Sequence, residues 1–235
     1  MRVIAFAGPS LPPAAREAFG GVEWRPPAEA GDLLRLDAGP GTTICLIDGY
    51  FDHRPAVRHK EILLLLSQGV RVLGASSIGA LRAAEMDTFG MVGVGAIYRA
   101  YRRGTITGDD EVALIHGPAE SGWRPLSAPL VDVRAAVAQL VRTKRMGKAE
   151  ARALLGRAAA IHYVDRSRAE LARWLPCDLV EQKKSDAALC LHMALQGGLR
   201  DPRRPGRIVT SALRWLAEEC GIDLEAGAKQ DHTRP

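Results

Sequence analysis

The stretch VRVLGASSIGALRAAEM (residues 70–86) changes character halfway along. It begins as an apolar, β-branched run, tightens at Ser76, Ser77 and Gly79, and continues as a string of helix-forming residues. An apolar run followed by small residues and a helical pattern predicts a buried strand, a tight turn and a helix. A turn of this kind can hold a phosphate or expose a nucleophile.

Other segments in the first part of the chain have the same alternation. RVIAFAG (2–8) and TTICLIDGYF (42–51) are short apolar runs bounded by glycine or proline, which is typical of buried parallel strands. RPAVRHKEILLLLSQG (54–69) predicts a helix, with Pro55 suited to its first position and Gly69 to its end. Strands and helices in this order form right-handed βαβ units. We therefore expect an α/β fold: a mainly parallel sheet with flanking helices.

The pattern becomes helical after the predicted sheet. Residues 109–117 could supply one more strand, and from about residue 129 apolar residues recur at three- and four-residue spacings. We expect an α/β core over residues 1–135, a helical C-terminal region over 136–225 and a flexible tail over 226–235. The sequence leaves open whether the helical region is a separate domain or covers the sheet.

Composition excludes several classes of protein. Of the 235 residues, 47% are hydrophobic and 25% are charged, which is a globular balance and not that of a disordered chain. Aromatic residues make up 5%, which disfavours base-stacking platforms for nucleic acid. No run approaches 18 apolar residues, and the four scattered cysteines indicate free thiols in a reducing compartment. We expect a cytoplasmic protein that binds neither a membrane nor nucleic acid.

The net charge of +5 is unevenly distributed. Residues 1–128 hold 13 basic and 14 acidic side chains, whereas residues 129–235 hold 19 and 13. The basic excess therefore belongs to the helical part. It forms either a solvated face or a surface for an acidic peptide or protein.

Polar residues follow three of the predicted strands. Ser10 comes after the first, Asp48 closes the second, and Ser76 and Ser77 follow the third. Because the carboxyl ends of parallel strands meet at one sheet edge, where open α/β sheets form their sites, we expect these side chains to converge.

Ser77 is the candidate nucleophile. Small residues two positions before and after it, Ala75 and Gly79, give the spacing of a nucleophile elbow. Its hydroxyl would lie at a helix N-terminus, with the N–H groups of Ile78 and Gly79 facing a developing oxyanion. The same residue types also suit a simple helix cap or a phosphate cradle, so these two alternatives stay open.

Lys60 is the candidate base. The six histidines offer no evident triad partner, whereas Lys60 shares a helix face with Val57 and Leu64, directly before ILLLL. Desolvation on a partly apolar stripe lowers the pKa of a lysine, as a neutral general base requires. Asp48 could orient this amine. The alternative is a surface lysine whose stem lies along apolar neighbours.

Other chemistries have weaker support in the sequence. No P-loop is present, and no GxGxxG follows a predicted strand, so we expect no nucleotide cofactor. The acids at 109–111 could hold a divalent ion, but three consecutive acids more often lie in a solvated loop. We expect no metal.

Several long motifs resemble the TfuA-like family in the same order and with similar spacing. They cover residues 1 to about 135 and read VIAFAGPSLP, IDGYF, HKEIL, SQGVRVLGASSIGALRAAEM, FGMVGVGAIYRAY, DDEVA and HGPAESGWRPLS. The resemblance implies a partner of YcaO enzymes in backbone thioamidation, in which a peptide amide oxygen is replaced by sulfur. It also implies that the YcaO enzyme, and not this chain, uses ATP.

The resemblance further implies a Ser-Lys hydrolase that releases sulfide from a thiocarboxylated ThiS-like sulfur carrier and strengthens engagement of the precursor peptide or protein by YcaO. The serine of the family's ASxGALRAAE motif corresponds to Ser77, and the lysine of HKEIL corresponds to Lys60. Ser76 departs from the family pattern, where a smaller residue is expected. The competing hypothesis is a docking module without chemistry of its own, in which Ser77 caps a helix and Lys60 is a surface charge.

Overall fold

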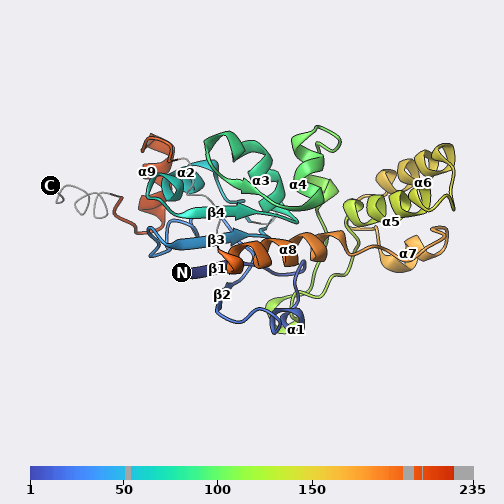
Figure 1. Cartoon of the computed structure of the whole chain (residues 1–235), viewed down its shortest axis with the longest axis horizontal. Helices are drawn as coiled ribbons and strands as arrows, with labels where there is room; N and C mark the ends of the chain where they lie inside the picture. The colour runs from blue at the N-terminus through green and yellow to red at the C-terminus, as the bar shows by residue number, and fades with distance from the viewer. Residues whose placement is uncertain (51–53, 198–203, 208, 225–235) are drawn as a thin grey trace.

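A computed structural model describes residues 1–50, 54–197, 204–207 and 209–224. Within these ranges five strands form one sheet in the order β2-β1-β3-β4-β5, and every pairing is parallel (Figure 1). The strands are β1 (Arg2–Phe6), β2 (Val22–Arg25), β3 (Thr42–Leu46), β4 (Arg71–Gly74) and β5 (Val92–Gly93). The predicted α/β fold with a mainly parallel sheet, followed by helices, is confirmed.

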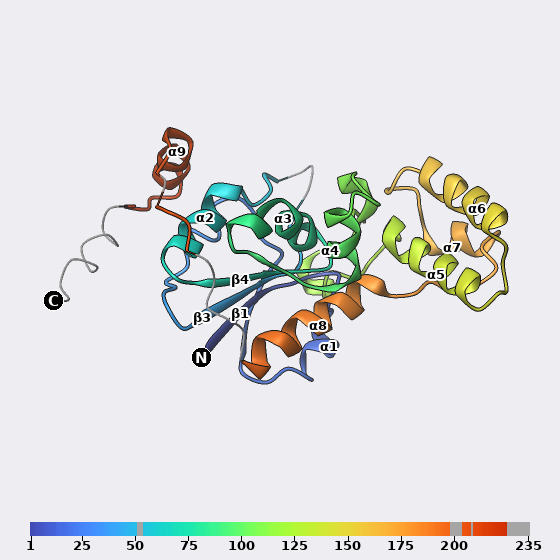
Figure 2. The same ribbon diagram turned by 45° about the horizontal axis from the view of Figure 1, so that its top comes forward.

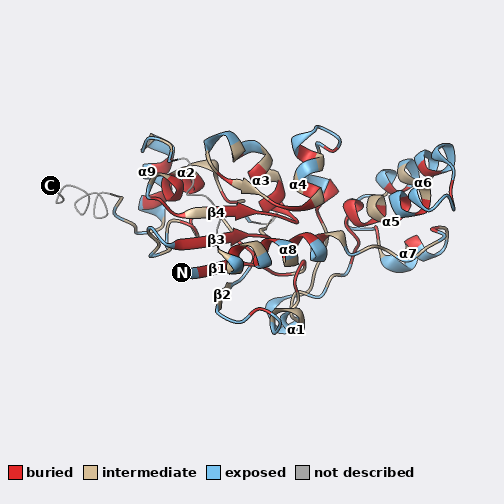
Figure 3. Ribbon diagram, viewed as in Figure 1, coloured by how far each residue is buried: buried red, intermediate tan, exposed pale blue. Residues whose placement is uncertain are grey.

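Helices cover both faces of this sheet. In chain order the α-helices of the described residues are α1 (Pro13–Arg16), α2 (His59–Ser67), α3 (Ile78–Met86), α4 (Gly95–Arg102), α5 (Leu130–Arg142), α6 (Lys148–Ala160), α7 (Arg168–Ala172), α8 (Gln182–Gln196) and α9 (Ser211–Glu219). Figure 2 shows α2 and α3 on one side of the strands and α8 on the other. The three central strands β1, β3 and β4 are accordingly buried along nearly their whole length, whereas β2 and β5 at the sheet edges are half-buried or exposed (Figure 3).

Alternate strand residues supply two separate cores. Ile44 and Leu46 of β3 face the cluster that includes Ile62 and Leu66 of α2. Cys45 lies between them in sequence and faces the opposite cluster, with Ala187, Cys190 and Leu191 of α8. This alternation follows from the two-residue period of a strand, and it explains why the strands are apolar on both faces.

The helical C-terminal residues are divided between two places. Helices α5, α6 and α7 form a lobe with its own core, built around Val133, Val137 and Leu171. Helix α8 then returns and packs against β1, β3 and β4. Part of the predicted helical region thus covers the sheet. The predicted tail at 226–235 lies outside the described residues.

Two predicted elements differ from those observed. The helix expected over 54–69 begins at His59, because Arg58 is extended (φ −92°, ψ 146°) and its N–H donates to the Glu61 carboxylate. The prediction of a further strand within residues 109–117 is wrong, because Asp109–Glu111 forms a 3-10 turn. The fifth strand is instead β5 (Val92–Gly93), between α3 and α4.

None of the helices in the described ranges combines the length and apolar character needed to cross a bilayer.

Glycines let α3 begin directly against the sheet. A Cβ at Gly79 would lie 1.7 Å from the Leu46 carbonyl oxygen, and one at Gly74 would lie 2.1 Å from the Gly79 carbonyl oxygen. Neither obstacle is a side chain that can turn away, because both are backbone atoms. The close approach of α3 to β3 and β4 therefore requires glycine at these positions.

We expect Gly79→Ala to lower the free energy of unfolding by about 3 kcal/mol or more, because the added methyl group forces α3 away from β3. Urea denaturation measures this change. Gly156→Ala in α6 is the control, since a Cβ there meets nothing within 4 Å, and it is expected to leave stability unchanged or raise it by up to about 1 kcal/mol. Equal stabilities of the two variants would contradict the packing argument.

Candidate functional site

The turn between β4 and α3 is unusually tight. The Ser77 N–H donates to the Ala75 carbonyl at 2.8 Å, which closes a three-residue turn around Ser76. Ser76 has φ 66°, in the left-handed region, whereas Ser77 has φ −115°. A non-glycine residue in this region costs on the order of 1–3 kcal/mol. The left-handed residue of this turn is thus Ser76, and the candidate nucleophile Ser77 follows it directly.

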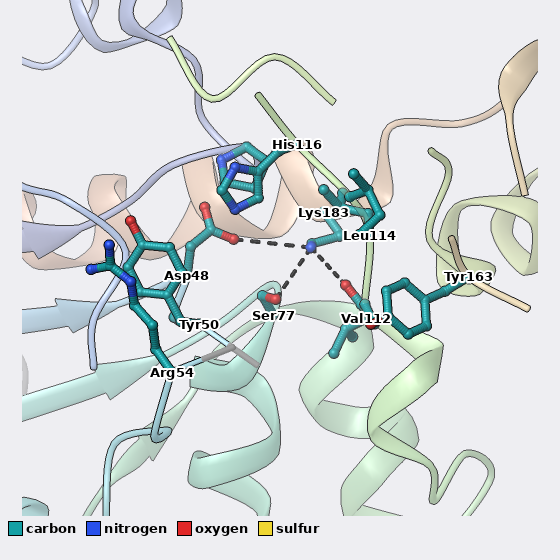
Figure 4. Close-up of a pocket in the computed structure, with 13 residues that line it drawn as sticks. Asp48, Tyr50, Arg54, Ser77, Val112, Leu114, His116, Tyr163 and Lys183 are labelled. Carbon is teal, nitrogen blue, oxygen red and sulfur yellow. Dashed lines mark hydrogen bonds and ion pairs between the residues drawn. The ribbon is translucent and has the colours of Figure 1, made fainter. Parts of the chain in front are cut away.

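Ser77 lies at the N-cap of α3, but its side chain caps nothing. Its Oγ is 3.2 Å from the Nζ of Lys183, which also donates to the Val112 carbonyl at 2.8 Å (Figure 4). The Asp48 carboxylate lies 4.0 Å from the same amine. The Ser77 hydroxyl thus contacts a lysine, and its side chain makes no capping bond to α3.

Lys183 is a buried amine. It is 4% exposed, and burial lowers its pKa, while the nearby charges of Asp48 and Asp132 act in the opposite direction. It lies in the first turn of α8, where the positive end of the helix dipole also disfavours an ammonium. A neutral amine can donate to the Val112 carbonyl and still offer its lone pair to the Ser77 hydroxyl.

A carboxylate from the helical lobe fixes the start of α8. Asp132 in α5 is 5% exposed and accepts a hydrogen bond from the Lys183 N–H at 3.2 Å. Burial raises the pKa of Asp132 to about 6, although hydrogen bonds to the first N–H groups of α8 favour the charged form. The lobe therefore positions the helix that carries the lysine.

Asp48 is held by a buried polar network that includes Ser10 and Ser76, so the predicted convergence of these residues is confirmed. Its Oδ2 accepts the N–H groups of Gly8 (2.8 Å) and Ser10 (2.9 Å), and its Oδ1 accepts the Ser10 hydroxyl at 2.5 Å. The Ser76 hydroxyl donates in turn to Ser10 at 2.8 Å. Ser76 thus faces Ser10 and Asp48, whereas Ser77 faces Lys183. This arrangement distinguishes the two adjacent serines.

Lys60 lies elsewhere. It is half-buried in the first turn of α2, and no hydrogen bond or ion pair joins it to Ser77 or Asp48 in the part of the chain that the structure describes. Its predicted companion Val57 precedes the helix, because α2 starts four residues later than Pro55 predicts. The lysine that lies beside Ser77 is Lys183 and not, as the sequence predicts, Lys60.

The two predicted oxyanion donors also differ from each other. The Gly79 N–H is directed at the Ile47 carbonyl at 3.4 Å, inside the contact between α3 and β3. The Ile78 N–H, at the first position of α3, has no acceptor among the described residues. Of the predicted pair, Ile78 is the group that can donate to a bound anion.

Ser77, Lys183 and Asp48 line a cavity of about 290 Å³. Further lining comes from the segment between the core and the lobe, which contributes Val112, Leu114 and His116 (Figure 4). The other labelled lining residues are Tyr50, Arg54 and Tyr163. The Tyr50 and His116 rings lie 6.1 Å apart, and the Arg54 guanidinium is 4.6 Å from the Tyr50 ring. The cavity thus brings a serine, a buried amine, a carboxylate and an imidazole together in one pocket.

The acids at 109–111 do not lie in this cavity. Glu111 is buried and accepts both the Nε and the Nη2 of Arg134 in α5. This ion pair accounts for the most enclosed of the three carboxylates. Within the described residues no cluster of three or more His, Cys, Asp or Glu has metal-binding geometry.

Sequence reasoning missed Lys183 and His116. Lys183 could have been found by the argument that selected Lys60, because Lys183, Ala187, Cys190 and Ala194 recur at helical spacing and form one buried face. A lysine at the head of an apolar stripe signals desolvation. His116 had no such signal, since its place in the cavity depends on the path of an irregular segment.

Comparison with protein families gives one match. A family model described as TfuA-like protein matches residues 48–167. The matched range contains Asp48, Ser77 and the cavity wall at 112–116, and it ends before Lys183. No curated protein matches the chain.

Asp132 gives the site a pH-dependent stability. A carboxyl group whose pKa is raised in the folded state stabilises the fold below its unfolded pKa of 3.8 and loses that contribution as pH rises through about 6. Asp132→Asn keeps the acceptor oxygen and removes the titration. We expect the stability of the wild type relative to Asp132→Asn to fall by up to about 3 kcal/mol between pH 4 and pH 7. Urea denaturation at each pH measures it, and a constant difference would contradict the assignment.

Proposed function

Because the chain belongs to the TfuA-like family, which supports a role as an accessory protein in the YcaO system, we propose that it is a Ser-Lys hydrolase that supplies sulfide for backbone thioamidation. Its substrate is a ThiS-like sulfur carrier that ends in a thiocarboxylate, and the YcaO partner uses ATP to activate the peptide amide. The contact between Ser77 Oγ and the buried Lys183 amine carries this proposal.

The first half of the reaction forms an ester on the serine. Neutral Lys183 accepts the Ser77 proton while Oγ attacks the thiocarboxylate carbonyl carbon. The Ile78 N–H donates to the developing oxyanion. The carbon–sulfur bond then breaks, and the sulfur leaves as hydrosulfide once it has gained a proton.

The second half restores the enzyme. Water attacks the ester carbonyl carbon, the ester bond to Ser77 breaks, and Lys183 returns its proton to Oγ. The carrier leaves with an ordinary carboxylate. The net reaction consumes one water for each hydrosulfide released. Asp48 stabilises the transient ammonium of Lys183 from 4.0 Å.

The carrier and the precursor peptide or protein are the macromolecular partners of this reaction, together with the YcaO enzyme. The lining of the cavity comes mostly from the α/β core and the segment at 112–116, and Tyr163 comes from the lobe. A carrier tail reaching Ser77 thus contacts both parts of the chain. A docking module without chemistry is the alternative, and the variants below separate it from a hydrolase.

We expect Ser77→Ala and Lys183→Met to lose sulfide release from a thiocarboxylated carrier by at least about 10³-fold, because each removes half of the serine–amine pair. Lys60→Ala is expected to retain activity. Sulfide is measured in a purified assay, with folding checked by circular dichroism.

Lys184→Met is the matched control, because Lys184 is adjacent in sequence, 48% exposed and paired with Glu181. It should release sulfide at the wild-type rate. Loss of activity in Lys60→Ala but not in Lys183→Met would overturn the assignment of the base. Wild-type protein that releases no sulfide, yet supports thioamidation from free sulfide by docking, would replace the hydrolase by the docking module.

The protonation of Lys183 predicts the pH dependence of the rate. The reactive amine is neutral, so activity rises with pH through the Lys183 pKa, which burial lowers from the ordinary lysine range. The Asp48 charge raises this pKa. Asp48→Asn is therefore expected to shift the rising limb of kcat/KM to lower pH. A shift to higher pH, or none, would contradict electrostatic coupling across the 4.0 Å contact.

A further inference from the structure

The proposed reaction requires a proton at the sulfur. A thiocarboxylate is already an anion, so attack by Ser77 places charge on both oxygen and sulfur of the tetrahedral intermediate. The Ile78 N–H can serve the oxygen. Lys183 has by then taken the serine proton, which the serine oxygen needs back when the ester is cleaved. A separate proton donor beside the sulfur satisfies both requirements.

Few groups on the cavity wall can act as this donor. Besides Lys183, the described lining residues that can carry a positive charge are Arg54 and His116. Arg54 is 54% exposed and pairs with Glu29 at 3.2 Å, and a guanidinium does not release its proton. His116 is half-buried, and imidazole both gives and takes protons near neutral pH.

The hydrogen bonding of His116 decides which nitrogen is reactive. Its Nδ1 lies 2.7 Å from the Gly117 carbonyl oxygen. A carbonyl only accepts hydrogen bonds, so Nδ1 carries a hydrogen and Nε2 is the nitrogen that gains and loses a proton. Nε2 has no hydrogen-bond partner among the described residues. Figure 4 shows His116 on the same cavity as Lys183 and Asp48.

The backbone around His116 is fixed by pairing with a second segment. The Gly117 N–H donates to the Arg124 carbonyl at 2.9 Å, and the Leu126 N–H donates to the Ile115 carbonyl at 2.8 Å. The Ile115 N–H donates to Ser127 Oγ at 2.8 Å. The imidazole is therefore presented by a paired segment, as a catalytic group requires.

We propose, on the basis of the proposed function, that His116 is the acid that protonates the leaving sulfur and the base that activates the hydrolytic water. The imidazolium form of His116 places its Nε2 proton against the anionic sulfur. As the carbon–sulfur bond breaks, the Nε2 proton passes to sulfur and hydrosulfide leaves.

The same group then completes the cycle. Neutral Nε2 takes a proton from the attacking water, the hydroxyl joins the acyl carbon, and the Lys183 ammonium returns its proton to Ser77 Oγ. The product acid ionises in solvent. In total, thiocarboxylate and water become carboxylate, hydrosulfide and one proton, and His116, Lys183 and Ser77 are restored.

Two substrates that share the same acyl group but differ in their leaving groups test the role of His116 as the acid. A peptide ending in a glycine thiocarboxylate needs a proton at its leaving group, whereas the p-nitrophenyl ester of the same peptide does not. In the first turnover, His116→Asn and His116→Gln are expected to release sulfide at least about 10²-fold more slowly than the wild type. Both variants are expected to keep the wild-type burst of p-nitrophenolate, with slower turnover after it.

The controls separate this proposal from the proposed function. In His116→Asn the side-chain amide can keep the hydrogen bond to the Gly117 carbonyl, and in His116→Gln it can place a neutral donor near the Nε2 position. His192→Gln is the matched control, because His192 is exposed and outside the cavity lining, and it is expected to release sulfide at the wild-type rate. Normal sulfide release by both His116 variants, or equal loss of both first turnovers, would overturn the acid role alone. Wild-type protein without sulfide release, with Ser77→Ala indistinguishable from it, would overturn the hydrolase and this role together.

Discussion

The burial of the Lys183 amine is the constraint on which the site depends. An ammonium in this position loses its hydration, and the Val112 carbonyl and the more distant Asp48 carboxylate replace only part of it. The balance favours the neutral amine at a lower pH than for a solvated lysine. The Ser77 hydroxyl contacts that amine at 3.2 Å, so the same burial that costs stability places a serine beside a desolvated lysine.

Three parts of the chain meet to keep this amine in place. The apolar face of α8 packs on the sheet through Ala187, Cys190 and Leu191. Asp132 of the lobe caps the first turn of α8, and Asp186 of α8 accepts the Ile97 N–H at the start of α4 at 2.8 Å. The lysine is thus positioned by the lobe, the sheet and α4 at once. A shift of any of them changes the distance to Ser77.

The segment that carries His116 is tied to the core in a different way. The Arg16 guanidinium lies between the rings of Trp24 and Trp123, 5.1 and 5.0 Å from their centroids, and donates to the carbonyls of Leu11 and Ala7. Trp123 belongs to the irregular segment that returns toward His116. The cation–π contacts therefore fasten that segment across the carboxyl edge of the sheet. This segment is rich in glycine and proline and forms no long helix or strand. The contacts of Arg16 with the two tryptophan rings therefore help to hold the segment in position.

The sequence determined the parallel sheet, the tight turn after β4 and the convergence of Ser10, Asp48 and Ser76 at one edge of the sheet. These follow from strand periodicity and from the rule that sites form at the carboxyl ends of parallel strands, both of which are local or topological. Only the tertiary structure decided that Lys183 and not Lys60 lies beside Ser77. Helical periodicity shows that a lysine heads an apolar face, but the packing of α8 on the sheet joins it to a serine 106 residues away.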